Sequence, residues 1–308
     1  MVLGDIRYLH GGDVYCGAAF CLSGTKILKL TTIGGTALYK QNLHTHTTYT
    51  DGRNAPEELI EVALARGFDS IGFSEHTLNA YSPALNQLTE EKTALYRKEI
   101  AALKEKYRGQ IDIFCGLEYE FYSEVPQDGY DYLIGSVHYL ECGGGIFGFD
   151  RGFDDTVAYV QNNFGDDGLR FAKKYFETLA RLPERGNFDI IGHFDLITKN
   201  NERGGFIDVS DKRYLNAGME AIEALKGKIP LFEVNTGAIA RNYRTQPYPQ
   251  MEFLKEFRRQ GFGAIISSDC HNKEFLDCHF DESRELLLAA GFNSIWVLTD
   301  GGFKETGI

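Results

Sequence analysis

The sequence has no run of apolar residues long enough to cross a membrane, and it lacks the basic start and apolar segment that mark a secretory signal. None of its six cysteines forms a Cys-x-x-Cys pair, so we expect free thiols in a reducing, cytoplasmic compartment. Basic residues are outnumbered: 32 Lys and Arg oppose 44 Asp and Glu, for a formal net charge of -12. This balance argues against nucleic acid or an anionic membrane surface as a general partner. An anionic substrate would therefore need a locally positive pocket.

The first 36 residues differ from the rest of the chain, because they are rich in glycine and show no clear periodicity. We expect residues 1–36 to form an N-terminal extension outside the fold, although the apolar stretch 14–22 is also compatible with a segment that lies against the surface. We expect residues 37–308 to form one domain, since α/β barrels of this length often have a single core. The expected assembly is a monomer or a small homo-oligomer.

From residue 37 onward, short apolar runs alternate with helical patterns. The runs cover residues 37–43, 69–74, 111–115, 130–136, 188–191, 231–235, 264–268 and 294–298. Helices are predicted between them, the first from Pro56, because proline fits a first helical turn and the acids after it suit the helix dipole. Strands that alternate with helices indicate a parallel sheet, and about seven such units favour a closed or nearly closed barrel.

The first apolar run leads into the stretch Leu43-His-Thr-His-Thr-Thr-Tyr-Thr-Asp-Gly52. Residues two apart on a strand point to the same face, so His44 and His46 present both imidazoles to one point. Asp51 follows in a loop, and Gly52 permits the turn that returns its carboxylate. Two imidazoles and a carboxylate suit a divalent cation such as zinc, although two ordinary histidines on a half-exposed strand would give the same pattern.

The same arrangement recurs along the chain, because residues able to bind metal follow one apolar run after another. Six of the eight histidines and three acids share this position: His44, His46, His76, His138, His193, His271, Asp51, Glu118 and Asp269. A single histidine there is usually a capping or packing residue. Six on one barrel face would each need partners for two nitrogens, which metal coordination supplies. Nine ligands are too many for one zinc and suit three cations, whose charge would attract a phosphate.

These motifs, in this order, resemble the polymerase-and-histidinol-phosphatase (PHP) superfamily over residues 38–298: His-x-His-(x)4-Asp-Gly, Ser-Glu-His, Gly-Leu-Glu, Gly-Ser-Val-His, Gly-His and Ser-Asp-x-His. The resemblance implies a distorted (β/α)7 TIM-like barrel that holds three divalent metal ions. It implies a first metal on His44, His46, Glu118 and Asp269, a second on Glu118, His138 and His193, and a third on Asp51, His76 and His271. Histidine and carboxylate sites accept zinc, manganese and iron, so the identity of the metal stays open.

Within the superfamily, Gly192-His-Phe-Asp-Leu-Ile197 and Phe232-Glu-Val-Asn-Thr-Gly237 resemble the histidinol-phosphatase branch, as does Arg241 followed by Tyr248-Pro249. The implied reaction is hydrolysis of L-histidinol phosphate in histidine biosynthesis. The implied nucleophile is a hydroxide that bridges the first two metals, held by Glu118 and Asp269. The alternatives are a phosphoesterase for nucleotides or oligonucleotides and a metal-binding scaffold without catalysis.

Substrate contacts are less defined by the motifs. The planar guanidinium of Arg241 suits bidentate recognition of phosphate, with a surface salt bridge as the alternative, and Arg244 is a second candidate. Glu120 or Asp195 would receive the amine or imidazole of histidinol. The glycine-rich loop 143–152 is either a lid or a plain surface connection, and Cys270 is more simply a buried structural thiol than a nucleophile.

Overall fold

The computed structural model describes residues 38–81 and 87–308, so the predicted extension 1–36 lies outside the described residues. Seven strands form one parallel sheet in the order β1-β2-β3-β4-β7-β8-β9. Their bounds are β1 Gln41–Asn42, β2 Ser70–His76, β3 Asp112–Glu120, β4 Tyr132–Ser136, β7 Ile190–Ile191, β8 Leu231–Asn235 and β9 Gly263–Ser267. The first seven apolar runs of the sequence are thus the seven barrel strands.

The sheet closes on itself just beyond the ends of β1 and β9. Thr45 bridges Cys270 in parallel, with the amide of His46 donating to the Cys270 carbonyl (2.9 Å) and the amide of Cys270 donating to the His44 carbonyl (3.0 Å). Below this bridge, the Asn42 amide group donates to the Ser268 hydroxyl (2.7 Å). We call this junction the seam, and it makes the sheet a nearly closed barrel.

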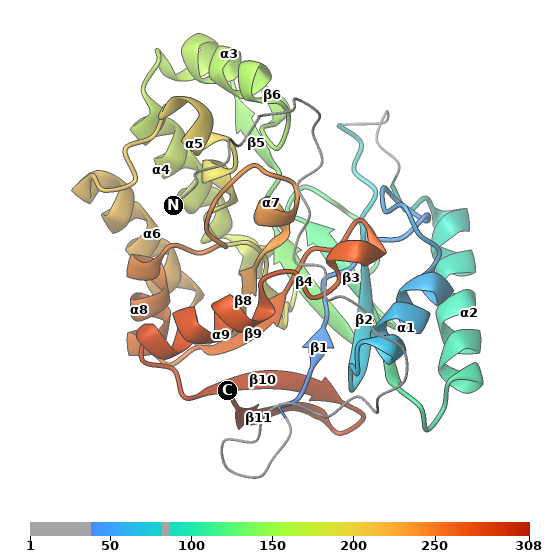
Figure 1. Ribbon diagram of the computed structural model, residues 1–308. Coiled ribbons are helices and arrows are strands. Elements are labelled where there is room, and N and C mark those ends of the chain that lie inside the picture. The colour runs from blue at the N-terminus through green and yellow to red at the C-terminus, as the bar shows by residue number, and fades with distance from the viewer. Residues whose placement is uncertain (1–37, 82–86) are drawn as a thin grey trace, which may run out of the picture. The chain divides into compact units, whose positions relative to one another are not determined.

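Helices cover the outside of the strands (Figure 1). They are α1 Pro56–Ala65, α2 Glu90–Lys106, α3 Phe153–Phe164, α4 Gly168–Leu179, α5 Asn201–Gly204, α6 Lys212–Leu225, α7 Gly237–Ala240, α8 Met251–Gln260 and α9 Phe280–Ala289, with short 3-10 turns η1 Leu182–Glu184, η2 Leu196–Thr198 and η3 Lys273–Phe275. Three long helices begin at caps that the sequence supplies: Thr89, Asp167 and Asp211 each accept a hydrogen bond from an amide of the first turn. None of the helices in the described ranges is long and apolar enough to span a bilayer.

Two parts of the fold depart from a regular alternation of strand and helix. No helix separates β3 from β4, which are joined by a short connection. The glycine-rich segment after β4 forms an antiparallel hairpin, β5 Tyr139–Cys142 and β6 Gly145–Gly148, followed by α3, which the sequence patterns did not predict. The barrel is therefore distorted on this side.

The prediction that the final apolar run continues the βα pattern was wrong. Strand β10 (Ser294–Thr299) pairs with β11 (Gly302–Gly307) in a separate antiparallel hairpin below the barrel (Figure 1). Its Leu298 is buried in the lower barrel interior, in a cluster with Leu43, Phe114, Tyr132, Ile134, Ile190, Leu231 and Ile265. The run is apolar because it closes the base of the barrel.

Tyr132 separates this apolar base from the upper interior. Its ring lies against β3, where a Cβ on Gly116 would come within 2.2 Å of it, so only glycine fits there. Its hydroxyl donates to the carbonyls of Leu43 and Phe73 (3.1 Å to Phe73). The polar residues at the carboxyl ends of the strands lie above this layer.

Candidate metal centre

All nine residues that the sequence predicted as ligands come together at the carboxyl ends of the strands. They contribute to four overlapping groups whose ligand atoms lie within 4.8 Å of one another: His44, His46 and Glu118; His44, His193 and Asp269; Glu118, His138 and His193; and His46, Asp51, His76 and His271. His44 and His46 follow β1 and Gly52 returns the chain, because a Cβ there would lie 2.2 Å from the His46 carbonyl oxygen.

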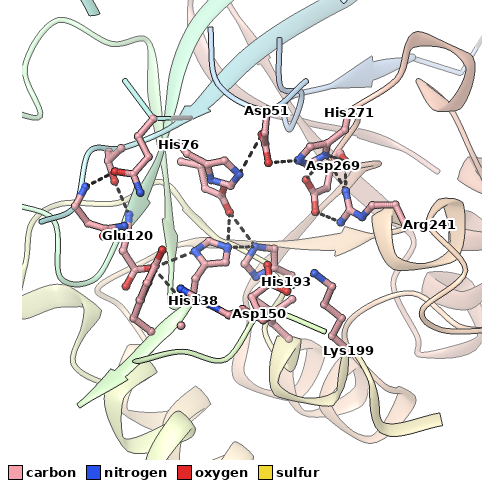
Figure 2. Close-up of a pocket in the computed structure, with 18 of the residues that line it drawn as sticks. Asp51, His76, Glu120, His138, Asp150, His193, Lys199, Arg241, Asp269 and His271 are labelled. Atoms are coloured by element: carbon pink, nitrogen blue, oxygen red, sulfur yellow. Dashed lines mark hydrogen bonds and ion pairs between the residues drawn. The ribbon is translucent and has the colours of Figure 1, made fainter. Parts of the chain in front are cut away.

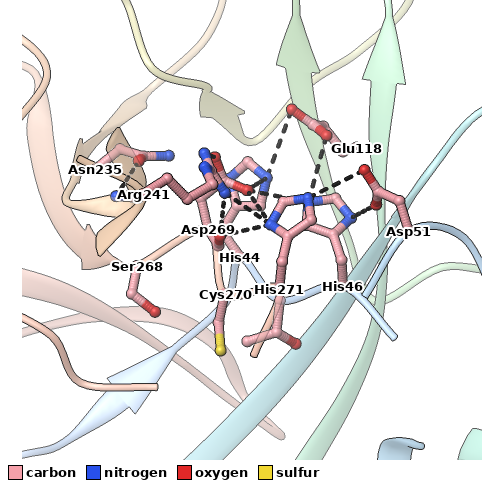
Figure 3. A network of polar contacts seen from close by, with 12 residues as sticks. His44, His46, Asp51, Glu118, Asn235, Arg241, Ser268, Asp269, Cys270 and His271 are labelled. Atoms are coloured by element: carbon pink, nitrogen blue, oxygen red, sulfur yellow. Dashed lines mark hydrogen bonds and ion pairs between the residues drawn. The ribbon is translucent and has the colours of Figure 1, made fainter. Parts of the chain in front are cut away.

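The first predicted group lies deepest. The Nε2 atom of His44 is 3.5 Å from Glu118 Oε1 and 3.7 Å from Asp269 Oδ1, and Nε2 of His46 is 3.6 Å from Glu118 Oε2 and 3.3 Å from Asp269 Oδ1. All four side chains are buried. Figure 3 shows the four side chains close together, joined by the contacts given above.

The second group shares Glu118 with the first. Nε2 of His193 is 2.9 Å and Nε2 of His138 is 3.3 Å from Glu118 Oε1, and the two nitrogens are 3.2 Å apart. The third group lies nearer solvent, where Asp51 Oδ1 is 3.5 Å from His76 Nε2 and Asp51 Oδ2 is 3.3 Å from His271 Nε2. Glu118 also reaches this group, through His76 Nδ1 at 2.6 Å. Glu118 therefore faces histidines of all three groups at short distance.

These residues fit divalent cations in spacing and in chemistry. Ligand atoms about 2.1 Å from a tetrahedral ion lie roughly 3.4 Å apart, which matches most of the separations above. Nε2 of His44, both ring nitrogens of His46 and Nδ1 of His193 are buried without a hydrogen bond. Buried polar atoms are rarely left so, and a cation would satisfy Nε2 of His44 and one nitrogen of His46.

The surroundings of the histidines lower the pKa of His46 and raise the pKa of three others. Burial, and the nearby imidazoles of His76 and His271, lower the pKa of His46 to about 3, so this ring is neutral. Burial alone would lower the pKa of His138, but the carboxylates of Glu118 and Glu120 raise it to about 10. The same balance raises the pKa of His44 and His76 well above the usual value, and the imidazoles hold the pKa of Glu118 well below its own. Protons thus occupy positions that a cation would take.

Asp269 has an unusual backbone conformation, with φ at 46° in the left-handed region. Such a conformation costs a non-glycine residue about 1–2 kcal/mol and needs local support. Arg241 supplies it: Nη1 donates to the Asp269 carbonyl (3.0 Å) and Nη2 to Asp269 Oδ2 (2.7 Å). Nη1 also lies 2.8 Å from Nδ1 of His271. Arg241 therefore orients two of the predicted ligands.

A cavity of about 310 Å³ opens above the cluster, and its walls carry both signs of charge. The positively charged side chains in its wall are those of Arg241, Lys199 and Arg151. Glu120 lies on the other side of His138 and His193 (Figure 2). Lys199 forms an ion pair with Asp150, from the segment after β6. The glycine-rich segment therefore contributes to the cavity wall through Gly148, Asp150 and Arg151, and is more than a plain surface connection.

Two other predicted substrate contacts do not line this cavity. Arg244 is directed into the protein, where Nη1 donates to the Thr198 hydroxyl (2.6 Å), lies 3.7 Å from Asp195 Oδ1, and its guanidinium stacks 4.4 Å from the Tyr248 ring centroid. Asp195 is fully buried and accepts from the Gln250 amide (3.1 Å). Of the four predicted substrate contacts, Arg241 and Glu120 line the cavity, and Arg244 and Asp195 form a buried ion pair outside it.

We expect Arg244→Ala to reduce stability and not substrate affinity. Removing one member of a buried ion pair leaves the other uncompensated, which costs about 3–5 kcal/mol in the free energy of unfolding. Urea denaturation of the variant measures this loss, and its KM for substrate should stay within about threefold of wild type because no contact in the cavity changes. A KM raised tenfold at unchanged stability would place Arg244 at the substrate after all.

Several residues of the site carried no predicted role. Glu233, at the centre of β8, is fully buried beneath the histidines and accepts from His44 Nδ1 (2.9 Å). Lys199, Asp150 and Arg151 line the cavity. The sequence signal for Glu233 was a charged residue in the middle of a mostly apolar strand. Lys199 and Arg151 lie in irregular segments, where no sequence pattern marks them.

Cys270 fits the structural role expected of it. Its thiol is buried, donates to the Asn272 carbonyl (3.0 Å), and has its pKa raised to about 12 by burial. A thiol with such a pKa is not a nucleophile near neutral pH. Cys115 and Cys142 are also free thiols.

The barrel and the cluster of imidazoles and carboxylates at its strand ends define a metal-binding class of α/β-barrel proteins. Residues 42–237 match the family model of the PHP domain. Since the match spans more than half of the chain, this protein belongs to the PHP domain family, as its motifs predicted.

Individual proteins agree with this assignment. The chain is 28% identical over 249 residues to a probable histidinol-phosphatase of Deinococcus radiodurans, which covers 77% of this chain and 87% of the relative. It is 25% identical over 269 residues to a histidinol-phosphatase of Lactococcus lactis subsp. lactis, covering 83% and 93%. A crystal structure of histidinol phosphate phosphatase from Lactococcus lactis, complexed with zinc, L-histidinol and phosphate, matches with a TM-score of 0.69 and 21% identity, covering 87% of this chain and 100% of that chain. The TIM-like barrel predicted from the sequence is confirmed.

Proposed function

We propose that this protein is a metal-dependent histidinol-phosphatase, which hydrolyses L-histidinol phosphate to L-histidinol and phosphate in histidine biosynthesis. The observation that carries the proposal is the position of Glu118. This buried carboxylate faces histidines of all three groups at the floor of a cavity whose wall holds Arg241 and Lys199. The histidinol-phosphatases to which the chain is similar support the choice of substrate.

The residues would hold three divalent cations in the sets that the motifs imply. His44, His46, Glu118 and Asp269 would bind the first, Glu118, His138 and His193 the second, and Asp51, His76 and His271 the third. Bound divalent ions supply Lewis acidity, which lowers the pKa of coordinated water to about 7 and neutralises charge on a transferring phosphoryl group. The identity of the metal is zinc, manganese or iron.

The chain itself positions the substrate. Arg241 has one face in the cavity, where its guanidinium can donate to phosphate oxygens while it holds Asp269, and Lys199 adds a second positive charge. Glu120 is 4% exposed and uses one oxygen, Oε2, to accept from the amide (2.8 Å) and Nδ1 (3.0 Å) of His138. Its other oxygen, Oε1, accepts one long hydrogen bond from the Tyr122 amide (3.4 Å) and can accept a second from the amine of histidinol. Cations toward the phosphate and a carboxylate toward the amine match the two ends of this substrate.

Metal binding should release protons and grow tighter as pH rises. The raised pKa values of His44, His76 and His138 mean that these rings are protonated near pH 7 in the metal-free protein, and a ligand nitrogen must lose its proton to bind. Below the pKa of a ligand histidine, protons compete with zinc for its nitrogen. The apparent zinc affinity should therefore rise with pH, by about tenfold per proton released for each pH unit between pH 6 and 9. Calorimetry in buffers of different ionisation enthalpy counts these protons. An affinity that is flat over this range would contradict the assignment of these histidines.

The test of the proposed function is steady-state hydrolysis of a phosphate-ester panel by the metal-loaded protein. Histidinol phosphate should exceed nucleoside monophosphates and dinucleotides in kcat/KM by at least about 100-fold, because a carboxylate placed for an amine is left unpaired by substrates that lack one. Preference for the nucleotides would favour the alternative phosphoesterase. No turnover with any ester, at full metal content, would favour a binding scaffold.

The compartment follows from the same proposal. We propose that the protein works in the cytoplasm, where Cys115, Cys142 and Cys270 remain reduced.

A further inference from the structure

Glu233 lies beneath the metal centre, where it is fully buried and does not line the cavity. It therefore touches neither a substrate in the cavity nor the point where the Nε2 atoms of His44 and His46 meet. From this position we infer that Glu233 is a positioning residue, which fixes the tautomer of His44 so that Nε2 is free to bind the first metal. The inference rests on the proposed function.

Both carboxylate oxygens of Glu233 accept hydrogen bonds. Oε1 accepts from the His193 amide (2.6 Å) and from the side-chain nitrogen of Asn235 (2.8 Å). Oε2 accepts from the Ser267 hydroxyl (2.6 Å) and lies 2.9 Å from Nδ1 of His44, which is also 3.2 Å from Oε1. Glu233 thus joins the ends of four strands, and each of its four neighbours offers it a proton.

Two of these donors cannot be reversed. The His193 amide is a backbone N–H, and the orientation of the Asn235 side chain is fixed because its oxygen accepts from the Gly237 amide (2.9 Å). Any side chain at position 233 must therefore place a hydrogen-bond acceptor where Oε1 lies. On the Oε2 side, a carboxylate requires Nδ1 of His44 to carry the proton. The neutral ring then has its lone pair on Nε2, which is buried, free of hydrogen bonds and directed at Glu118 and Asp269.

This geometry makes Glu233→Gln a selective variant. The new amide oxygen must face the His193 amide and Asn235, so the NH2 group faces Ser267 and His44. The Ser267 hydroxyl can turn and accept. The NH2 group then stands at the nearer position, 2.9 Å from Nδ1 of His44, and the amide oxygen lies 3.2 Å from it. The close NH2 donor opposes a proton on Nδ1 and favours the tautomer with the proton on Nε2, which cannot bind metal. The substitution keeps the volume of the side chain and changes one tautomer.

Glu120 offers a matched control, because it also lies against Nδ1 of a predicted ligand. It accepts from the amide and from Nδ1 of His138 through the same oxygen, Oε2. In Glu120→Gln the amide oxygen can replace that atom and keep both bonds, at the loss of the long hydrogen bond from the Tyr122 amide to Oε1 (3.4 Å). Both variants remove one negative charge beside a histidine, but only Glu233→Gln sets an NH2 donor at the oxygen position nearest Nδ1 of its histidine.

The experiment combines zinc binding with a direct measurement of the tautomer. In competition with a chelator, Glu233→Gln should bind one zinc per chain about 10- to 100-fold more weakly than wild type, whereas Glu120→Gln should lose less. Long-range ¹H–¹⁵N spectra of histidine-labelled protein, assigned with His44→Gln, should show His44 protonated at Nδ1 in zinc-loaded wild type. In Glu233→Gln, at a zinc concentration that leaves its first site empty, they should show His44 protonated at Nε2. His138 should stay protonated at Nδ1 in Glu120→Gln.

The outcomes separate this inference from the proposed function. A wild-type protein that binds no divalent cation would overturn the proposed function. Wild-type zinc binding with equal losses in the two variants, and no change of tautomer in Glu233→Gln, would overturn the role of Glu233 alone. If Glu233→Gln does not fold, the wild-type spectrum still decides, because an unprotonated Nδ1 on His44 in the zinc-loaded protein is incompatible with the inference.

Discussion

Glu118→Gln should reduce kcat/KM for histidinol phosphate by on the order of 1,000-fold or more. The variant keeps the shape of the side chain but removes the charge that faces the histidines of all three groups. Loss of a residue that only supports a metal ligand costs about 10–100-fold, so loss of a ligand shared by two cations should cost more. Steady-state kinetics at saturating metal, with elemental analysis of the same preparation, measures both effects, and metal content should fall by at least one ion per chain.

A matched variant controls for the loss of a buried acid. Glu75 is fully buried and accepts from the Thr47 amide (2.9 Å) and from the hydroxyls of Thr47 and Thr50, which an amide can satisfy after the hydroxyls turn. Glu75→Gln should therefore keep most of the turnover. Full activity in Glu118→Gln, or an equal loss in both variants, would show that Glu118 does not hold the metals.

Arg241→Ala should lower kcat/KM by roughly ten- to a hundred-fold, because a charge-assisted contact to phosphate contributes about 1.5–3 kcal/mol. The structure adds a second consequence. Since Arg241 also holds the carboxylate and the carbonyl of Asp269, its removal should weaken the first metal as well, in contrast to a residue that contacts phosphate alone. Kinetics at several zinc concentrations separates the two: excess zinc should restore the metal content but only part of kcat/KM.

Arg241→Lys is the informative companion, because an ammonium group provides charge without the planar pair of donors. It should recover part of the phosphate contact and little of the support for Asp269. Wild-type kcat/KM in Arg241→Ala would remove this arginine from substrate recognition, and unchanged zinc affinity would mean that Asp269 keeps its position without it.

The barrel and the predicted ligand cluster could be read from the sequence for one reason. Each candidate residue follows an apolar run, and parallel strands bring their carboxyl ends to one face. Side chains in irregular segments could not be placed in the same way. Arg241 and Arg244 are three residues apart, but Asn242 between them has φ of 57°, and the chain turns so that one arginine enters the cavity and the other pairs with Asp195.

The base of the barrel shows a similar limit. The run at β10 is as apolar as a barrel strand, and its partner β11, with the sequence Gly-Phe-Lys-Glu-Thr-Gly, has no apolar pattern of its own. Whether β10 joins the sheet as an eighth parallel strand or forms a hairpin depends on whether an edge strand of the sheet, β1 or β9, is free to pair. Because β1 and β9 already meet at the seam, no edge remained for β10.

The seam has a consequence for how the empty and loaded proteins differ. His44 and His46 lie on one side of it, and Asp269 and His271 lie on the other. A cation bound between them, as proposed, would tie the first barrel strand to the last, much as a cross-link ties two distant parts of a chain, and its binding free energy would be added to that of closure. Removal of metal should therefore loosen the cylinder at this junction before elsewhere, so that chelation, heat and proteolysis act on the same place.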